Sequence, residues 1–199
     1  MHGDLATILR PPTGSAFAFD PGALCLALAA TGGEGDLNVY ETLHAPSDLA
    51  AWIRSVLGAG PSRVDSATLA QARRLRAAIW QLAEAAADGR PVPPRAAAAV
   101  NRTAGGQPPA RRIGTDGVAA WAGPVTAAAA LALVARDAVD LFGGPRRARV
   151  RRCAGERCRL IFADESRSGR RRWCSMQRCG NRAKVRAFRD RTKEDSDEQ

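Results

Sequence analysis

Four of the five cysteines in this 199-residue sequence lie near its C-terminal end, at a spacing that could hold a metal ion. They form two pairs, with four residues inside each pair and fifteen between the pairs: Cys153 and Cys158, then Cys174 and Cys179. Each short loop can present two thiolates to one side of a tetrahedron, so the pattern predicts a zinc site. The spacer is long enough for a hairpin that brings the pairs together. Because four thiolates fill the coordination shell of zinc, we expect one structural Zn²⁺ ion and no position for a catalytic water.

Other uses of the four thiols stay open at this point. They could be redox groups, unpaired structural cysteines or iron–sulfur ligands, although neither pair has the shorter spacing of ferredoxins. The fifth cysteine, Cys25, lies in an apolar run and is expected to be a buried thiol. The two histidines, His2 and His44, do not lie among acidic residues at a useful spacing. With no acid–base pair or nucleophile that stands out, we expect that the protein is not an enzyme.

Basic residues surround the cysteine pairs. Residues 146–193 contain 18 Arg and Lys against 4 Asp and Glu, whereas residues 1–145 contain 12 Arg, no Lys and 12 acidic residues. Four acidic residues follow within residues 194–199, and the formal net charge of the whole chain is +10. The sequence thus divides into a neutral body (1–145), a basic module (146–193) and an acidic tail (194–199). So concentrated a positive charge favours an anionic partner, and we expect nucleic acid.

The basic module contains few large apolar residues, so we expect zinc to contribute on the order of 10 kcal/mol to its folding. Residues 160–162 predict a strand, residues 166–172 an arginine-rich turn, and residues 181–191 a helix. Val185 and Phe188 are three residues apart on this helix, and we expect them to face the zinc core. The basic residues of the helix and turn then remain outside, where they can enter the major groove or follow the phosphates: Arg170, Arg171, Arg172, Arg182, Lys184, Arg186 and Arg189.

The neutral body is predicted to be mainly helical. Apolar periodicity and alanine content indicate helices within residues 47–57, 65–88, 95–103 and 124–142. Ser47 is expected to cap the first of these helices.

Short strands accompany the helices of the body. Residues 17–19 predict a strand that leads into a helix from Leu24, and residues 37–42 alternate as in a short strand. Residues 110–122 predict a hairpin that turns at Asp116-Gly117. We therefore expect a mainly α fold with α+β character. It combines a helical N-terminal domain, with a few short strands or a hairpin, and a small C-terminal four-cysteine zinc finger made of knuckles, a short hairpin and a basic helix.

The composition also bears on location. Hydrophobic residues make up 45% of the sequence, enough for a core, and the longest apolar run near the start, residues 23–30, is too short to cross a membrane. We expect a cytoplasmic, nucleoid-associated protein with no membrane partner.

The residues around the second cysteine pair resemble a known family. The motif Arg172-Trp173-Cys174-Ser175-Met176, followed by Cys179-Gly180-Asn181-Arg182 and Lys184, is similar to the CGNR zinc finger. The resemblance covers about residues 150–191 and includes the stretch from Asp164 to Arg167. In that family the finger follows an N-terminal ABATE domain, described as a stress-induced transcription regulator, which residues 17–145 resemble in the order of their features.

One part of the N-terminal domain departs from the family pattern. Family members carry an Asp and an Asn-Thr pair in the early apolar run, and residues 26–31 of this sequence keep only the threonine, Thr31. The sequence alone does not decide whether the altered stretch from Ala27 to Ala30 leaves a working ligand pocket.

The resemblance and the charge distribution lead to one expectation and two alternatives. We expect a bacterial, zinc-dependent, DNA-binding transcription regulator of the stress response, whose finger contacts double-stranded DNA. Its N-terminal domain would sense a signal, such as a small-molecule effector, or would oligomerise, for example into a homodimer. The alternatives are an RNA- or ribosome-associated zinc-binding module and a small-molecule-binding protein. The target sequence, the effector, the sign of regulation and the oligomeric state are not determined by the sequence.

Overall fold

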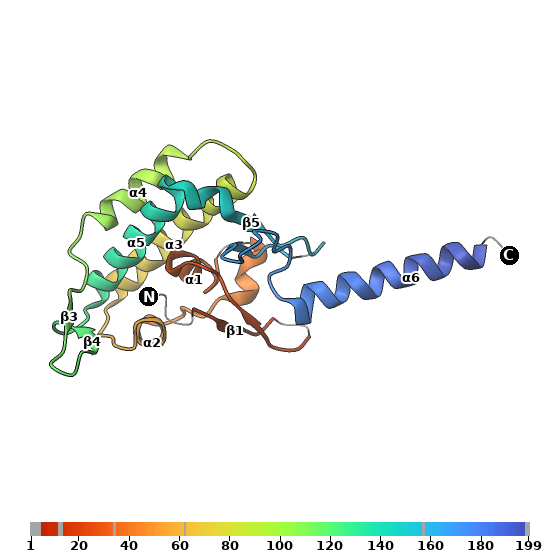
Figure 1. The fold of residues 1–199 in the computed structure, drawn as a ribbon. Helices are drawn as coiled ribbons and strands as arrows, with labels where there is room; N and C mark the ends of the chain where they lie inside the picture. Colours follow the sequence, from red (N-terminus) through yellow and green to blue (C-terminus); the bar gives the residue numbers. More distant parts are fainter. Residues whose placement is uncertain (1–4, 12–13, 34, 62, 157, 198–199) are drawn as a thin grey trace.

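The computed structural model describes residues 5–11, 14–33, 35–61, 63–156 and 158–197. Among these residues, packed helices form the body, three separate pairs of short antiparallel strands lie around it, and one long helix projects away from it (Figure 1). The expected mainly α fold is therefore confirmed. No helix among the described residues has the combination of length and apolar character that a membrane span requires.

Three helices make the centre of the body: α3 (Ser66–Ala87), α4 (Pro94–Ala104) and α5 (Ala127–Gly143). The short helix α1 (Leu24–Ala29) packs against α3 and α5, and α2 (Pro46–Leu57) packs against the same two helices. The predicted apolar stripes form their shared core, which includes Leu75 and Ile79 of α3 and Leu131 of α5. The four helices predicted in the body are thus all present.

The starts of two helices show how local chemistry sets their bounds. The Asp65 carboxylate accepts a hydrogen bond from the Thr68 N–H at 2.7 Å, and α3 begins immediately after Asp65. The expected Ser47 cap is wrong, because α2 already begins at Pro46. The Asp48 carboxylate, rather than Ser47, accepts from the backbone N–H groups of the two residues before the helix, His44 and Ala45.

Residues 37–42 do not form the expected strand. Residues Gly35–Tyr40 form a 3₁₀ helix, η1, in which Leu37 and Tyr40 are buried and Val39 is 45% exposed. Residues three apart face the same side of a 3₁₀ helix, so the buried pair follows a period of three rather than two.

The strands pair locally and antiparallel. Strand β1 (Thr7–Leu9) pairs with β2 (Phe17–Phe19), β3 (Arg111–Ile113) pairs with β4 (Ala119–Trp121), and β5 (Val150–Arg152) pairs with β6 (Ile161–Ala163). The second pair is the predicted hairpin, and Gly117 in its turn has φ +76°, a conformation that favours glycine. The third pair forms a hairpin whose loop contains Cys153 and Cys158. A hairpin was expected within the fifteen-residue spacer, but only its second strand, β6, lies there.

Strand β6 joins the body and the cysteine region. Its alternate residues face opposite sides, as in any strand. Ile161 and Ala163 belong to the main helical core, whereas Leu160, just before the strand, and Phe162 belong to a second core that contains the cysteines. The N–H of Ala163 also donates to the Pro21 carbonyl at 2.9 Å. One face of β6 therefore packs against the body, and the other face packs against the core that contains the cysteines.

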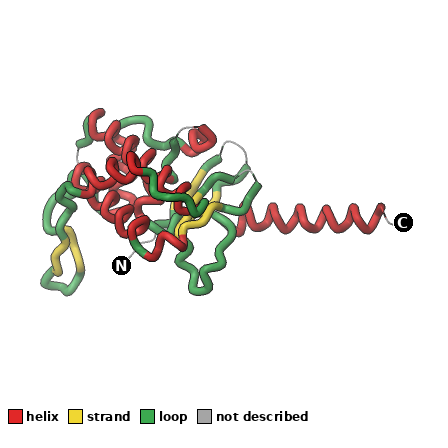
Figure 2. Tube along the Cα trace, turned by 90° about the horizontal axis from the view of Figure 1, so that it is seen from above, coloured by secondary structure: helices red, strands yellow, loops and turns green. Residues whose placement is uncertain are grey.

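The last helix, α6 (Asn181–Asp197), leaves the body after a short π-helical turn, η3 (Met176–Gly180). Figures 1 and 2 show from two directions that α6 extends away from the remaining elements. Sequence analysis predicted the start of this helix and placed its end near residue 191. The helix continues to Asp197, so the acidic tail begins inside it.

Candidate metal centre and its basic surroundings

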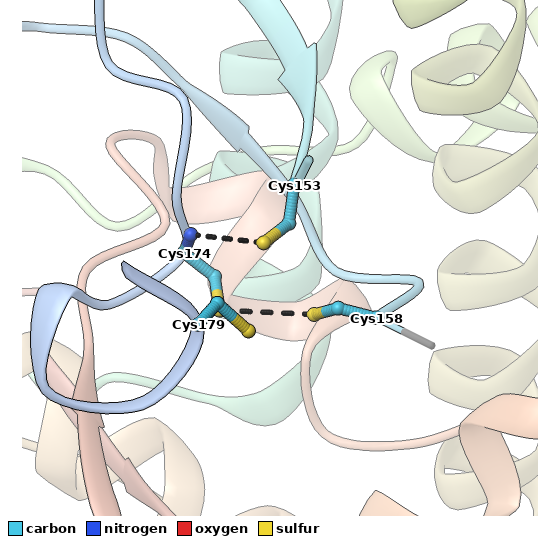
Figure 3. A group of neighbouring side chains, drawn as sticks. All are labelled: Cys153, Cys158, Cys174 and Cys179. Atoms are coloured by element: carbon cyan, nitrogen blue, oxygen red, sulfur yellow. Dashed lines mark hydrogen bonds between the residues drawn. The ribbon is translucent and has the colours of Figure 1, made fainter. Parts of the chain in front are cut away.

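The four C-terminal cysteines point toward one another from two loops (Figure 3). Cys153 follows β5 and Cys158 precedes β6, while Cys174 precedes η3 and Cys179 lies within it. All four sulfur atoms lie within 4.8 Å of one another, and three of the four residues are buried. The structure therefore brings together all four cysteines that the sequence assigned to metal.

The distances between the sulfurs fit a tetrahedral zinc site. The Sγ atom of Cys174 lies 3.7 Å from that of Cys158 and 3.6 Å from that of Cys179. Four thiolates at the usual Zn–S distance of about 2.3 Å stand at the corners of a tetrahedron whose edges are about 3.8 Å. Both the donor atoms and their separations thus suit zinc.

The electrostatics of the cluster also favour a bound cation. Hydrogen bonds from the Cys158 and Cys174 thiols, and then from the N–H groups of Cys174 and Gly155, hold the pKa of Cys153 well below its ordinary value. The same thiol–thiolate hydrogen bonding raises the pKa of Cys158 and of Cys174. Deprotonating a second and a third cysteine at these distances costs free energy, because the thiolates repel one another unless a cation lies between them. Metal binding by the thiolates therefore couples the folding of this region to the ion.

The second core surrounds the cysteines with apolar side chains from the N-terminal end of the chain. Phe17 and Phe19 of β2, Leu9 of β1 and Tyr40 of η1 pack with Phe162 around them. The first four of these residues lie more than one hundred positions from the cysteines in sequence, so no local pattern indicated them. The metal site is consequently built jointly by the two ends of the chain.

This packing explains why one expectation is wrong. Val185 and Phe188 of α6 do not face the metal core, since their side chains are 49% and 64% exposed. The β1–β2 pair already supplies apolar cover for the cysteines. Helix α6 therefore leaves the core, and its two large apolar residues remain largely exposed.

Asp164 organises the arginine-rich turn that follows β6. It is fully buried, and its carboxylate accepts from the Ser166 N–H at 2.9 Å, from the Ser166 hydroxyl at 2.5 Å and from the Arg171 N–H at 2.9 Å. Burial raises the pKa of Asp164, but these hydrogen bonds outweigh it and hold the pKa below its ordinary value. The sequence flagged this residue only through the family resemblance, and the structure shows what the side chain does.

Arg171 and Arg178 of the basic module point inward. Arg171 donates to the carbonyls of Trp173 and Cys174 at 3.0 and 2.8 Å, and its guanidinium lies 4.0 Å from the centre of the Phe162 ring. Arg178, which sequence reasoning missed, donates to the Tyr40 hydroxyl at 2.7 Å and lies 4.6 Å from the Phe17 ring centre. Arg171 thus braces the second cysteine loop, and Arg178 ties the root of α6 to the N-terminal domain.

Other arginines of the module pair with acids of the body. Arg152 bonds Asp88 at 3.0 Å and Arg159 bonds Asp36 at 3.0 Å. Arg152 and Asp88 lie 64 positions apart in the sequence, so a charge count by segment could not show this compensation.

The remaining predicted nucleic-acid contacts lie on the outside. Arg170 and Arg172 of the turn are exposed, as are Arg182, Lys184, Arg186 and Arg189 of α6. Arg186 forms an ion pair with Glu156, and Arg172 lies 5.2 Å from the Trp173 ring centre. Six of the seven predicted positions thus offer cations to solvent, and the seventh, Arg171, is engaged inside the finger.

A basic groove runs between the root of α6 and the N-terminal β1–β2 pair. It has a volume of about 660 Å³, and Phe17 and Val185 contribute apolar surface to it. Its charged lining comes from four arginines on one side of the helix and its root: Arg178, Arg182, Arg186 and Arg189.

The early apolar run is packed as core. Residues from Ala27 to Ala30 are at most 5% exposed, and Thr31 is 6% exposed. The Thr31 hydroxyl accepts from Arg76 at 3.2 Å, and Arg76 forms an ion pair with Glu41 at 2.6 Å. The one polar residue retained from the family pattern therefore belongs to a buried polar cluster.

Fold and site together define a helical domain that carries a C-terminal four-cysteine zinc finger. Residues 22–145 match the family model of the ABATE domain, described as "Putative stress-induced transcription regulator", and residues 149–192 match that of the CGNR zinc finger. The chain belongs to the ABATE family, and its finger is of the CGNR type. The finger match and the four adjacent cysteines both support zinc as the bound ion. No curated protein matches the sequence.

Proposed function

We propose that this protein is a zinc-dependent transcription regulator that binds double-stranded DNA through α6 and the arginine-rich turn. One structural zinc ion, held by Cys153, Cys158, Cys174 and Cys179, fixes the root of the helix and has no catalytic role. The observation that carries the proposal is the placement of α6: it starts two residues after Cys179, projects from the body and exposes its cations.

The dimensions of α6 suit the major groove. Its 17 residues make a helix about 25 Å long, and a helix with side chains is about 10–12 Å across. The major groove of B-DNA is about 12 Å wide and admits such a helix. Among the described elements, α6 packs chiefly against η3, so most of its length is available to a partner.

The arginine-rich turn supplies the second part of the interface. Asp164 holds the turn through Ser166 and Arg171, which leaves Arg170 and Arg172 exposed to contact phosphates. Arg171 acts from inside, by bracing the cysteine loop. Phosphate contacts from the turn would set the orientation of α6 in the groove.

The N-terminal domain would regulate this interface by sensing a signal or by oligomerising. Its physical link to the finger is the contact of Arg178 with Tyr40 and Phe17. Since Arg178 lies three residues before α6 begins, a shift of η1 or β2 would move the root of the helix. Such a regulator acts in the cytoplasm, on the nucleoid.

The proposal is tested by selection of fragmented genomic duplex DNA with the zinc-loaded, full-length protein at about 0.15 M salt. We expect retained fragments to share a short motif, and an excess of single-stranded RNA of the same sequences to compete weakly. Retention that disappears in the presence of RNA would overturn the proposal in favour of an RNA-binding module. No retention of duplex at all would overturn it outright.

A further inference from the structure

Helix α6 carries an exposed strip that is not basic, and two of its three residues, Asn181 and Val185, border the basic groove. At about 100° per residue, Asn181, Val185 and Phe188 fall within about 60° of one another on the helix surface. All three are exposed, Val185 by 49% and Phe188 by 64%. Exposed large apolar residues on a helix this polar need a reason other than the metal core, which the β1–β2 pair already covers.

Cations lie on both sides of this strip. By the same helical geometry, Arg189 lies about 40° beyond Val185 on one side, and Lys184 lies about 40° beyond Phe188 on the other. Both cations are exposed. An apolar centre with basic flanks complements the major groove, whose floor presents base edges and whose two walls are lines of phosphates.

We infer that Asn181, Val185 and Phe188 read A·T base pairs in the major groove, with Val185 and Phe188 against thymine methyl groups and Asn181 bonded to adenine. The chemistry is specific to that pair, because thymine alone among the DNA bases presents a methyl group in the major groove and an asparagine amide matches the N6 and N7 atoms of adenine. The inference rests on the proposed function and names what the proposed helix recognises.

The length of the strip sets the size of the recognised sequence. From Asn181 to Phe188 the helix rises about 10 Å, which corresponds to about three base-pair steps of 3.4 Å. We therefore expect a core of three or four base pairs that is rich in A·T.

The test removes only the thymine methyl groups. Duplexes that carry the selected motif are made with thymine or with uracil at each position, and their affinities for the zinc-loaded full-length protein are compared. We expect about a four-fold loss of affinity for each methyl group contacted, which corresponds to the value of one buried methyl group.

The Val185→Ala, Phe188→Ala double variant should bind the thymine duplex more weakly and should no longer distinguish thymine from uracil. Asn181→Ala should lose on the order of ten-fold in preference for adenine at one position.

Control variants separate base reading from loss of structure. Val139→Ala removes a side chain that is 40% exposed on α5, and it should leave thymine sensitivity unchanged. Zinc content and thermal stability should be the same in every variant, because the strip lies outside both cores.

Three results would overturn the inference while the proposed DNA binding stands. One is selection that retains duplex without a motif. Another is a motif whose affinity does not change when uracil replaces thymine. The third is a double variant that keeps thymine sensitivity but changes the sedimentation of the free protein, which would assign the strip to contact with a second copy. Loss of all duplex binding by the wild-type protein would instead refute the proposed function.

Discussion

Helices α3 and α6 are both long, but their surroundings are opposite. Helix α3 buries Leu75, Ile79 and Leu82 among its neighbours, and its one buried cation, Arg76, is paired with Glu41. From 181 to 189, α6 has eight exposed residues and one, Ala183, that is half-buried. Most helical stability in proteins comes from packing of an apolar face. Helix α3 is thus completed by its own chain, whereas under the proposed function α6 is completed by DNA.

The same difference separates two groups of arginines within the finger. Arg171 and Arg178 stack on aromatic rings and bond to oxygens of the protein. Arg182 and Arg189 lie on α6 and are exposed. Inward cations should therefore govern stability and outward cations should govern binding, and the following substitutions test that separation.

The largest effect is expected for Cys174→Ser. The Cys174 sulfur lies within 3.7 Å of two other sulfurs and is buried. Removing one of four thiolates should release the ion, which contributes on the order of 10 kcal/mol to folding in small zinc units. Metal analysis should find zinc lost, and DNA binding should disappear. Cys25→Ala is the control, since Cys25 packs in the helical core and its loss should leave zinc bound. A Cys174→Ser protein with full zinc content would contradict the assignment.

Glu41→Ala should cause the next largest decrease in the free energy of unfolding, and this decrease should come from the body alone. The change leaves Arg76 buried without its charged partner, and breaking a buried pair costs about 3–5 kcal/mol. Urea unfolding at neutral pH measures this loss. Glu165→Ala, which removes a more exposed pair with Arg146, should cost less than about 1 kcal/mol. The folded fraction of either variant should bind DNA as the wild type does, and a specific loss of affinity in Glu41→Ala would break the separation.

Asp164→Asn should reduce stability by about 2 kcal/mol and change its dependence on pH. The pKa of Asp164 is lowered in the folded protein, so the charged carboxylate stabilises the fold above the ordinary pKa of about 4. That contribution disappears as the pH falls through the lower, folded-state pKa. The difference in unfolding free energy between wild type and variant should therefore be largest at pH 7 and should shrink as the pH falls toward 3. Loss of zinc in acid is common to both proteins, so it does not by itself reduce the difference between them. A difference in unfolding free energy that stays constant across the pH range would argue against the role of the carboxylate.

Tyr40→Phe tests the smallest of the inward contacts. It removes the hydroxyl that accepts from Arg178 at 2.7 Å and leaves the contact of Arg178 with Phe17. We expect a loss of about 1 kcal/mol, visible as a small decrease in the thermal midpoint. The exposed Arg95→Ala change on α4 should move the midpoint less than Tyr40→Phe does. Equal effects would show that Arg178 does not tie the finger to the body.

Local patterns were sufficient for much of this structure. The cysteine spacing predicted the metal ligands, the stripes with Leu75 and Leu131 predicted the helices, and Asp116-Gly117 predicted the hairpin. Each of these signals is contained in a short stretch of sequence. The aromatic cover of the metal site was not predicted, because Phe17 and Phe19 reach the cysteines only through tertiary packing.

The errors have the same origin. Val185 and Phe188 were assigned to the metal core on their spacing, but the β1–β2 pair lies there. Arg171 and Arg178 differ in no local feature from their exposed neighbours, and only the position of Phe162, Phe17 and Tyr40 turns them inward. Spacing thus identifies which residues share a face, whereas tertiary contacts decide what that face meets.

We propose above all that the outward cations of α6 bind DNA phosphates. This proposal is tested most directly by the salt dependence of duplex affinity for the zinc-loaded wild type and for the Arg182, Lys184, Arg189→Ala triple variant. Each phosphate contact contributes about 0.9 to the slope of log affinity against log salt, so the triple variant should lower the slope by about 2.7. A triple alanine variant of exposed arginines on the body, Arg74, Arg95 and Arg102, should keep the wild-type slope. Equal slopes for the wild type and the α6 variant would contradict the account.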